Sequence, residues 1–228
     1  MRRAAGLLLA IVWLSGCATI SMFKTGRTIQ KNTGQIGMSI GGGKNVMRPS
    51  GYSNFDIDFP SVSMEVGGGY GITDALDISI KYAAPITVAG ELRYGFLSED
   101  RGAPVSIAVG VGGSYWALST DSGVYKNSLD SMDICVPLYL SHDVGKAMSL
   151  YLTPRYVSRN LTYKQDDPVF GSRQENLATP MIGGGIGVMF NFGTANDKHL
   201  AIEYNKVQWT KDSAIYSTQY GMALIFGI

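Results

Sequence analysis

The chain has 228 residues and a formal net charge of +1, from 19 basic and 18 acidic side chains. This balance excludes the strongly basic surface that nucleic-acid binding needs. Charged residues make up 16% of the chain, below the roughly 25% of a soluble domain, whereas glycine and tyrosine are abundant. A single domain is the default at this length, and the composition favours a β-barrel over a cytosolic enzyme.

The first 16 residues are predicted to be a signal peptide. Arg2 and Arg3 form a positive start, and residues 4–14 form an apolar run of 11 residues. A helix needs roughly 17–25 residues to span a bilayer, so this run has the length of a signal-peptide core. It is followed by Leu14-Ser15-Gly16-Cys17. This motif resembles the lipobox of bacterial lipoproteins, in which the chain is cut before the cysteine and that cysteine is acylated.

The resemblance implies that Cys17 carries acyl chains, palmitate among them, and anchors the protein in lipid. By analogy with enteric bacteria, Ala18 favours sorting to the outer membrane, with the anchor on the periplasmic side. Residues 17–33 are mostly polar and lack periodicity, so they are predicted to form a lipid-anchored tether. The second cysteine, Cys135, has no partner for a disulfide. Its apolar neighbours predict a small buried side chain instead of a reactive thiol.

Apolar residues alternate with small or polar ones throughout residues 34–228. In the last stretch, every second residue from Tyr216 to Ile228 is large, and most are apolar or aromatic. Such alternation is typical of a strand with one face in lipid and the other in a polar lumen. Ten strands are predicted, although eight or twelve are also compatible: 34–43, 61–72, 76–84, 88–97, 105–116, 132–142, 149–160, 179–192, 199–209 and 215–228.

The predicted fold is all-β, a transmembrane antiparallel up-and-down barrel. Short connections rich in Asp, Gly and Asn alternate with longer ones, as in barrels with short periplasmic turns and long outer loops. The alternative is a soluble β-sandwich or lipocalin-like barrel on a lipid tether, because alternation does not distinguish inside from outside. Small or singly charged residues opposite the apolar face, and Tyr and Phe at strand ends, favour the membrane barrel.

The lipobox and the last strand together resemble the outer-membrane β-barrel proteins of diderm bacteria. The resemblance implies that the barrel-assembly and lipoprotein-sorting machineries handle this chain. The last strand resembles the C-terminal signal by which such barrels are recognised for insertion. It departs from that signal by ending on Ile228 instead of an aromatic residue, with Phe226 as the last ring.

The ninth strand breaks the regular pattern. Continuing its phase past Tyr204 places Lys206 in lipid and Val207 inside the barrel. Either Lys206 lies at the rim and extends its ammonium group to water, or a bulge near Asn205 reverses the phase. The bulge is the preferred interpretation.

The inward face is predicted to carry charges of both signs. A buried charge in a narrow barrel needs a partner, so Arg93 and Arg155 are expected to pair with Glu91, Glu65 or Glu203. Ten strands enclose a lumen only slightly wider than one that side chains fill. We therefore expect a mostly plugged, salt-bridged lumen, with a constricted polar channel as the alternative. The predicted mid-height charge cluster consists of Glu65, Lys81, Glu91, Arg93, Arg155 and Glu203, and further inward charges are Asp77, Asp133 and Arg159.

Catalytic signatures are weak. The two histidines, His142 and His199, are expected beside turns, and the adjacent Ser141 and His142 point to opposite faces of a strand. The glycine triplets (41–43, 67–69 and 183–185) precede no helix and indicate tight curvature or close packing, not phosphate binding. Metal-ligand spacings are missing from the sequence. We therefore predict no enzyme, cofactor or metal.

Three functions are compatible with the sequence. They are a structural or surface-interaction protein of the outer membrane, a narrow passive pore for small solutes, and an outer-membrane enzyme acting on lipid or peptide. We expect the first, as a monomer among outer-membrane lipids. A surface partner would contact the predicted loops 44–60 and 161–178, which carry aromatic and apolar residues such as Tyr52, Phe55 and Phe170.

Overall fold

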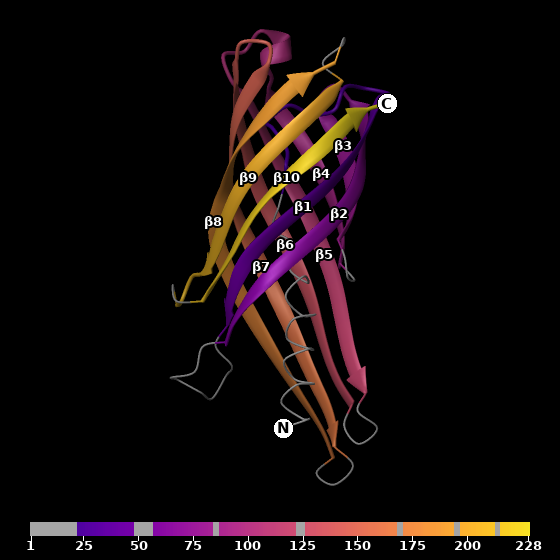
Figure 1. Cartoon of the computed structure of the whole chain (residues 1–228), viewed down its shortest axis with the longest axis vertical. Coiled ribbons are helices and arrows are strands. Elements are labelled where there is room, and N and C mark those ends of the chain that lie inside the picture. The colour runs from indigo at the N-terminus through magenta and orange to yellow at the C-terminus, as the bar shows by residue number, and fades with distance from the viewer. Residues whose placement is uncertain are drawn as a thin grey trace.

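Ten antiparallel strands close into a barrel in which each strand pairs with its neighbours in sequence and β1 pairs with β10 (Figure 1). This arrangement, seen in a computed structural model, confirms the predicted fold class and strand number. The structure describes residues 22–47, 57–83, 87–121, 126–167, 171–193, 197–212 and 215–228. The strands are β1 Gly34–Met47, β2 Ile57–Thr73, β3 Leu76–Ala83, β4 Thr87–Leu97, β5 Ser106–Asp121, β6 Lys126–Val144, β7 Met148–Asp167, β8 Gly171–Phe192, β9 Lys198–Trp209 and β10 Tyr216–Gly227, and a 3-10 turn spans Glu99–Arg101.

Among the described residues, no helix is both long enough and apolar enough to cross a membrane.

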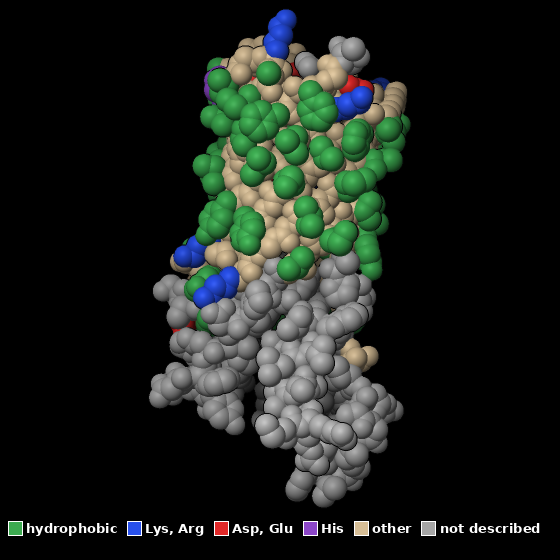
Figure 2. All heavy atoms as spheres, in the orientation of Figure 1, with side chains coloured by type: hydrophobic (Ala, Val, Ile, Leu, Met, Phe, Trp, Pro, Cys, Tyr) green, Lys and Arg blue, Asp and Glu red, His purple; other side chains and the backbone are tan. Residues whose placement is uncertain are grey.

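The outer surface is apolar and the interior is polar. On β2, Met64 is 63% exposed, whereas the next residue, Glu65, is 6% exposed and faces the lumen. Figure 2 shows hydrophobic side chains over the wall of the barrel, with Lys and Arg above and below them. A soluble barrel would show the opposite arrangement, with apolar residues inside. The orientation of the two faces therefore supports a membrane barrel.

The two ends of the barrel differ. The turn end, at the top of Figure 1, holds the connections β2–β3, β4–β5, β6–β7 and β8–β9 and the C-terminal Ile228. At the opposite end, the loop end, β5 to β8 extend beyond the other strands, and β6, β7 and β8 are the longest, with 19, 20 and 22 residues. Exposed aromatic side chains lie toward both ends. Tyr70, Tyr94 and Phe96 lie toward the turn end, and Tyr115 and Tyr220 toward the loop end.

The predicted outer loops are shorter than expected. Residues 44–47 and 57–60 belong to β1 and β2, and residues 161–167 and 171–178 belong to β7 and β8. The sequence obscures these extensions because both faces of a strand beyond the membrane can be polar, so the apolar alternation stops while the backbone pairing continues. The remaining loop residues, including Tyr52, Phe55 and Phe170, lie outside the described residues.

Strand β9 has no bulge at Asn205, so the preferred interpretation of this strand was wrong. Its pairing with β10 continues in register from Tyr204 to Gln208. Lys206 faces outward with its ammonium 5.2 Å from the centre of the Tyr216 ring, and Val207 is fully buried. An apolar side chain is accommodated inside because Val207 packs in a luminal cluster with Val157 and Met181.

Candidate functional site

The lumen contains the first described part of the chain, residues 22–33, which we call the luminal segment. Its deepest described residue, Met22, lies beside Glu203 at the middle of β9. The segment then runs to the turn end, where Lys31 bridges Gly71 and the chain enters β1. The tether predicted for residues 17–33 is therefore corrected for this part, which packs against the wall. The lack of periodicity arises because an irregular chain enclosed by a barrel has no single buried face.

The Glu203 carboxylate holds the inner end of the luminal segment. It accepts hydrogen bonds from the backbone N–H groups of Met22 at 2.8 Å and Phe23 at 2.7 Å. Phe23 has a φ of 47°, an uncommon value for a bulky residue, and the two successive N–H groups face one anion. The wall supports the carboxylate through a relay, because Arg155 donates to Asn205 and Asn205 donates to Glu203.

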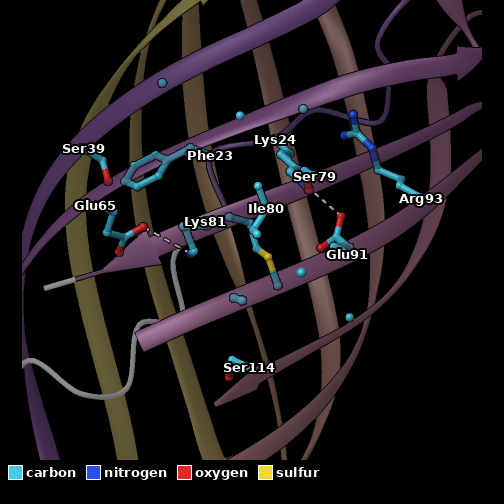
Figure 3. A pocket seen from close by; sticks show the side chains of 18 of the residues that line it. Phe23, Lys24, Ser39, Glu65, Ser79, Ile80, Lys81, Glu91, Arg93 and Ser114 are labelled. Carbon is cyan, nitrogen blue, oxygen red and sulfur yellow. Dashed lines mark hydrogen bonds and ion pairs between the residues drawn. The ribbon is translucent and has the colours of Figure 1, made fainter. Parts of the chain in front are cut away.

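The Lys24 side chain connects the luminal segment to the opposite wall. Its ammonium lies 2.8 Å from a Glu91 oxygen and 2.6 Å from the Ser79 hydroxyl (Figure 3). The other Glu91 oxygen accepts a hydrogen bond from the Tyr139 hydroxyl at 2.7 Å. Burial lowers the pKa of Lys24, whereas the adjacent Glu91 carboxylate acts in the opposite direction. Lys24 and Glu91 thus form an ion pair inside the barrel.

Arg93 and Asp77 hold the middle of the segment through its backbone. The Arg93 guanidinium contacts both Asp77 oxygens, the shortest distance being 2.7 Å, and donates to the Thr25 carbonyl at 2.8 Å. Asp77 also accepts a hydrogen bond from the Ile29 N–H at 2.9 Å. The predicted pairing of Arg93 with Glu91, Glu65 or Glu203 is corrected, because Asp77 lies directly opposite on the adjoining strand.

A fourth attachment lies near the turn end. Arg27 reaches Asp143 at 2.9 Å and the Ser149 hydroxyl at 3.0 Å. The backbone N–H of Gly26 donates to the Ser141 hydroxyl at 3.0 Å. Together with Glu203, Glu91 and Asp77, these contacts bind the segment at several heights in the lumen. Sequence reasoning missed Lys24, Arg27, Asp143 and Tyr139 as site residues, since none of them stands in a recognisable motif.

Several glycines leave the space that the luminal segment occupies. A Cβ on Gly26 would overlap the Ser106 carbonyl, and a Cβ on Gly71 would overlap the Gln30 carbonyl. A Cβ on Gly69 would lie 2.6 Å from the Ile29 side chain. Side chains at these positions would exclude the segment, so the close packing expected at the 67–69 triplet includes packing against residues from outside the sheet.

All six residues of the predicted charge cluster face the lumen. Besides the contacts above, Lys81 lies 3.2 Å from Glu65, which also accepts a hydrogen bond from Gln219. The further inward charges Asp133 and Arg159 form an ion pair at 2.7 Å. Arg155 reaches Asn205, as described. The lipidation site predicted at Cys17 lies outside the described residues.

The luminal segment does not fill the barrel completely. A cavity of about 190 Å³ lies between it and the wall. Apolar groups form most of the lining of this cavity and polar side chains the rest, and its volume is large enough for several water molecules. The side chains labelled in Figure 3 include Ser39, Glu65, Ser79, Lys81, Glu91 and Ser114.

The histidines lie at the turn end, as expected. His142 is exposed, with its Nδ1 2.9 Å from Glu99, and the His199 Nδ1 lies 2.9 Å from the Asn191 side chain. Ser141 points inward to Gly26 and is separated from His142 by the sheet. Within the part of the chain that the structure describes, no group of three His, Cys, Asp or Glu side chains is arranged to hold a metal.

Comparisons with solved structures give weak likenesses to outer-membrane barrels. The attachment invasion locus protein Ail of Yersinia pestis is 11% identical over 86% of this chain and 99% of its own, with a TM-score of 0.46. Neisserial surface protein A is 13% identical over 85% and 96%, with a TM-score of 0.40. The translocator domain of the autotransporter NalP from Neisseria meningitidis is 9% identical over 99% and 95%, with a TM-score of 0.46. Likenesses of this strength carry no argument about activity.

A comparison with curated proteins gives no match. Residues 44–224, which include most of the barrel, match the sequence profile of a family described as a membrane-bound β-barrel domain. The chain therefore belongs to this family of membrane-bound β-barrel domains, DUF5777.

Proposed function

We propose that the protein is a closed outer-membrane β-barrel with a structural or surface-interaction role and no enzymatic activity. The observation that carries this proposal is the luminal segment. It runs inside the barrel from the middle of β9 to the turn end and is bound by Glu203, Glu91, Asp77 and Asp143. Two further ion pairs, Lys81 with Glu65 and Arg159 with Asp133, also lie inside the barrel. A lumen closed in this way leaves the outer surfaces of the barrel to carry its function.

The loop end supports the surface-interaction role. Strands β5 to β8 extend past the other strands there, and the extended parts of β6, β7 and β8 are mostly polar and stay paired beyond the apolar wall. Given short turns on the periplasmic side, the loop end faces outward, and the partner surface includes the extended parts of β7 and β8. The protein acts as a monomer among outer-membrane lipids.

Planar-bilayer recording tests the closed state directly. We expect the purified full chain to insert without conducting. Heat modifiability on a gel must show in parallel that the sample is folded. Stable conductance steps from a folded sample would refute the closed state and favour the second candidate, a narrow passive pore, which the cavity of about 190 Å³ beside the luminal segment supports.

We also propose that Cys17 is acylated and that barrel-assembly and lipoprotein-sorting machineries deliver the protein. Met22, five residues later, lies inside the lumen, and five residues span at most about 17 Å. Mass spectrometry of the mature protein should show acyl groups on an N-terminal Cys17, and a Cys17→Ala variant should lack them. An unmodified wild-type cysteine would contradict this proposal.

A further inference from the structure

The charges on the lumen wall do not balance without the luminal segment. Among the described side chains, the inward-facing positions of the ten strands carry six acidic and four basic groups, a formal net charge of −2. Lys24 and Arg27 of the segment place two positive charges beside this wall. The acidic residues are Glu65, Asp77, Glu91, Asp133, Asp143 and Glu203, and the basic ones are Lys81, Arg93, Arg155 and Arg159.

The excess negative charge is concentrated where the segment binds. Four of the acidic groups already have a wall partner: Asp77 with Arg93, Asp133 with Arg159, Glu65 with Lys81, and Glu203 through Asn205 to Arg155. Glu91 and Asp143 have their ion pairs with Lys24 and Arg27. Departure of the segment would uncover these two carboxylates, one deep in the lumen and one at the turn-end rim.

The wall around the segment suits a water-filled path. Gly69 and Gly71 contribute no side chains there, and Ser39, Ser79 and Ser114 contribute hydroxyl groups. Because a ten-stranded barrel is only slightly wider than one filled by its own side chains, the path would be narrow. Carboxylates in a narrow, low-dielectric channel attract cations and repel anions.

We propose that residues 22–33 are a removable plug and that the passage they close is selective for small cations. Glu91 and Asp143 are the residues that favour cations over anions along this passage. The proposal rests on the closed state proposed above and adds both the class of solute and the element that controls access. In the closed barrel, the charged groups of Lys24 and Arg27 occupy the positions that a permeating cation would take in the open one.

The Gly26→Val variant of the full chain tests the plug. A Cβ at Gly26 would overlap the Ser106 carbonyl, so the substitution should displace the segment without altering the wall. Gly90→Val is the matched control, because Gly90 faces lipid and its nearest contact to an added Cβ is the Ser79 carbonyl at 3.9 Å. In planar bilayers with a KCl gradient, we expect Gly26→Val to conduct with K⁺ permeability several-fold above that of Cl⁻, and Gly90→Val to remain silent.

Two neutralising substitutions then test the selectivity. Adding Glu91→Gln and Asp143→Asn to Gly26→Val should bring the ratio of K⁺ to Cl⁻ permeability close to one. A folded Gly26→Val variant that stays silent or prefers Cl⁻ would overturn the proposal, as would a triple variant that keeps its cation preference. If Gly26→Val fails to fold, the double variant Lys24→Glu, Arg27→Glu replaces it, since like charges would then face Glu91 and Asp143. Conductance of the unaltered chain tests the closed state separately.

Discussion

Arg93 illustrates how single residues hold the interior of the barrel together. Its guanidinium is bonded to Asp77 on the wall and to the Thr25 carbonyl on the luminal segment, and its exposed fraction is 3%. Asp77 is fully buried. A buried ion pair contributes uncertain net stability, but removing one member leaves an uncompensated charge, and this is strongly destabilising.

We predict that Arg93→Ala lowers the free energy of unfolding by about 3–5 kcal/mol, because Asp77 loses its counter-charge. The double variant Arg93→Ala, Asp77→Ala should recover part of this loss, since neither member of this pair is left as an uncompensated charge. Urea unfolding in detergent micelles measures both effects. Arg101→Ala serves as the control, because Arg101 is exposed at the turn end, and it should unfold like the parent. A double variant less stable than Arg93→Ala would contradict this account.

The inward residues could be predicted from the sequence, but their partners could not. Alternation with period two places Asp77, Arg93, Asp133 and Arg159 inside without knowledge of the register. The sequence predicts Glu91, Glu65 or Glu203 as the partner of Arg93, whereas Asp77 lies directly opposite Arg93 on the adjoining strand. Asp133 and Arg159, for which the sequence predicts no partners, likewise lie opposite each other on β6 and β7. Cross-strand pairing of this kind depends on the register between strands, which turn lengths fix and alternation alone does not reveal.

At the scale of strands, β9 allows a direct test of which residues face outward and which face the lumen. Lys206 faces outward beside Tyr216, and Val207 is buried within the lumen. In a Cys135→Ala background, we predict that a cysteine placed by Lys206→Cys reacts readily with a water-soluble maleimide and one placed by Val207→Cys does not. Unfolding in urea should make both reactive, which controls for intrinsic reactivity. Fast labelling at Val207→Cys alone would show that a bulge reverses the strand after all.

The last strand closes the barrel. β10 pairs with β9 on one side and with β1 on the other, and Met222 to Phe226 take part in both ladders. Truncation after Gly221 would leave two sheet edges with unsatisfied backbone groups at the depth of the apolar wall, where no water is available. We therefore predict that the truncated chain gives no heat-modifiable band on a gel. Replacement of Ile228 alone by Ala should leave that band intact.

Strand existence was readable from the sequence, whereas strand ends were not. The apolar alternation of β7 ends near Tyr156, yet the strand continues to Asp167. The alternation of β8 begins near Ile182, yet the strand begins at Gly171. Beyond the apolar wall both faces of a strand meet water, so selection for an apolar face disappears. The extensions are then defined by backbone pairing alone, and backbone pairing cannot be recognised from the amino-acid composition.

At the scale of the whole molecule, the luminal segment accounts for features that looked unrelated in the sequence. It explains the acidic excess of the wall and part of the glycine content of β2. Its contacts join residues about 180 positions apart, as between Phe23 and Glu203. A stretch without periodicity gives no local sign of such partners, so the sequence alone predicts only a tether for residues 22–33. Their place follows from the shape of the space that the closed barrel leaves inside.

Enclosure of the segment predicts selective resistance to trypsin. Lys24 and Arg27 are cleavage sites by residue type, but their side chains are only 23% and 21% exposed and bonded to the wall. Lys146 is exposed in the β6–β7 turn. Because proteases act on transiently opened chains, we expect trypsin to cut the folded protein after Lys146 well before it cuts after Lys24 or Arg27.

The variants proposed for the conductance experiment also test, by proteolysis, whether the luminal segment stays inside the barrel. Gly26→Val should expose Lys24 and Arg27 to trypsin at rates close to that of Lys146, whereas Gly90→Val should protect them as the parent does. Mass spectrometry of the fragments at successive times gives the order of cleavage. Early cleavage after Lys24 in the folded parent would show that the segment leaves the lumen readily. The barrel would then be open for much of the time, and conductance of the parent should rise with it. Protection and electrical silence must therefore occur together, because both depend on the same residues remaining inside the barrel.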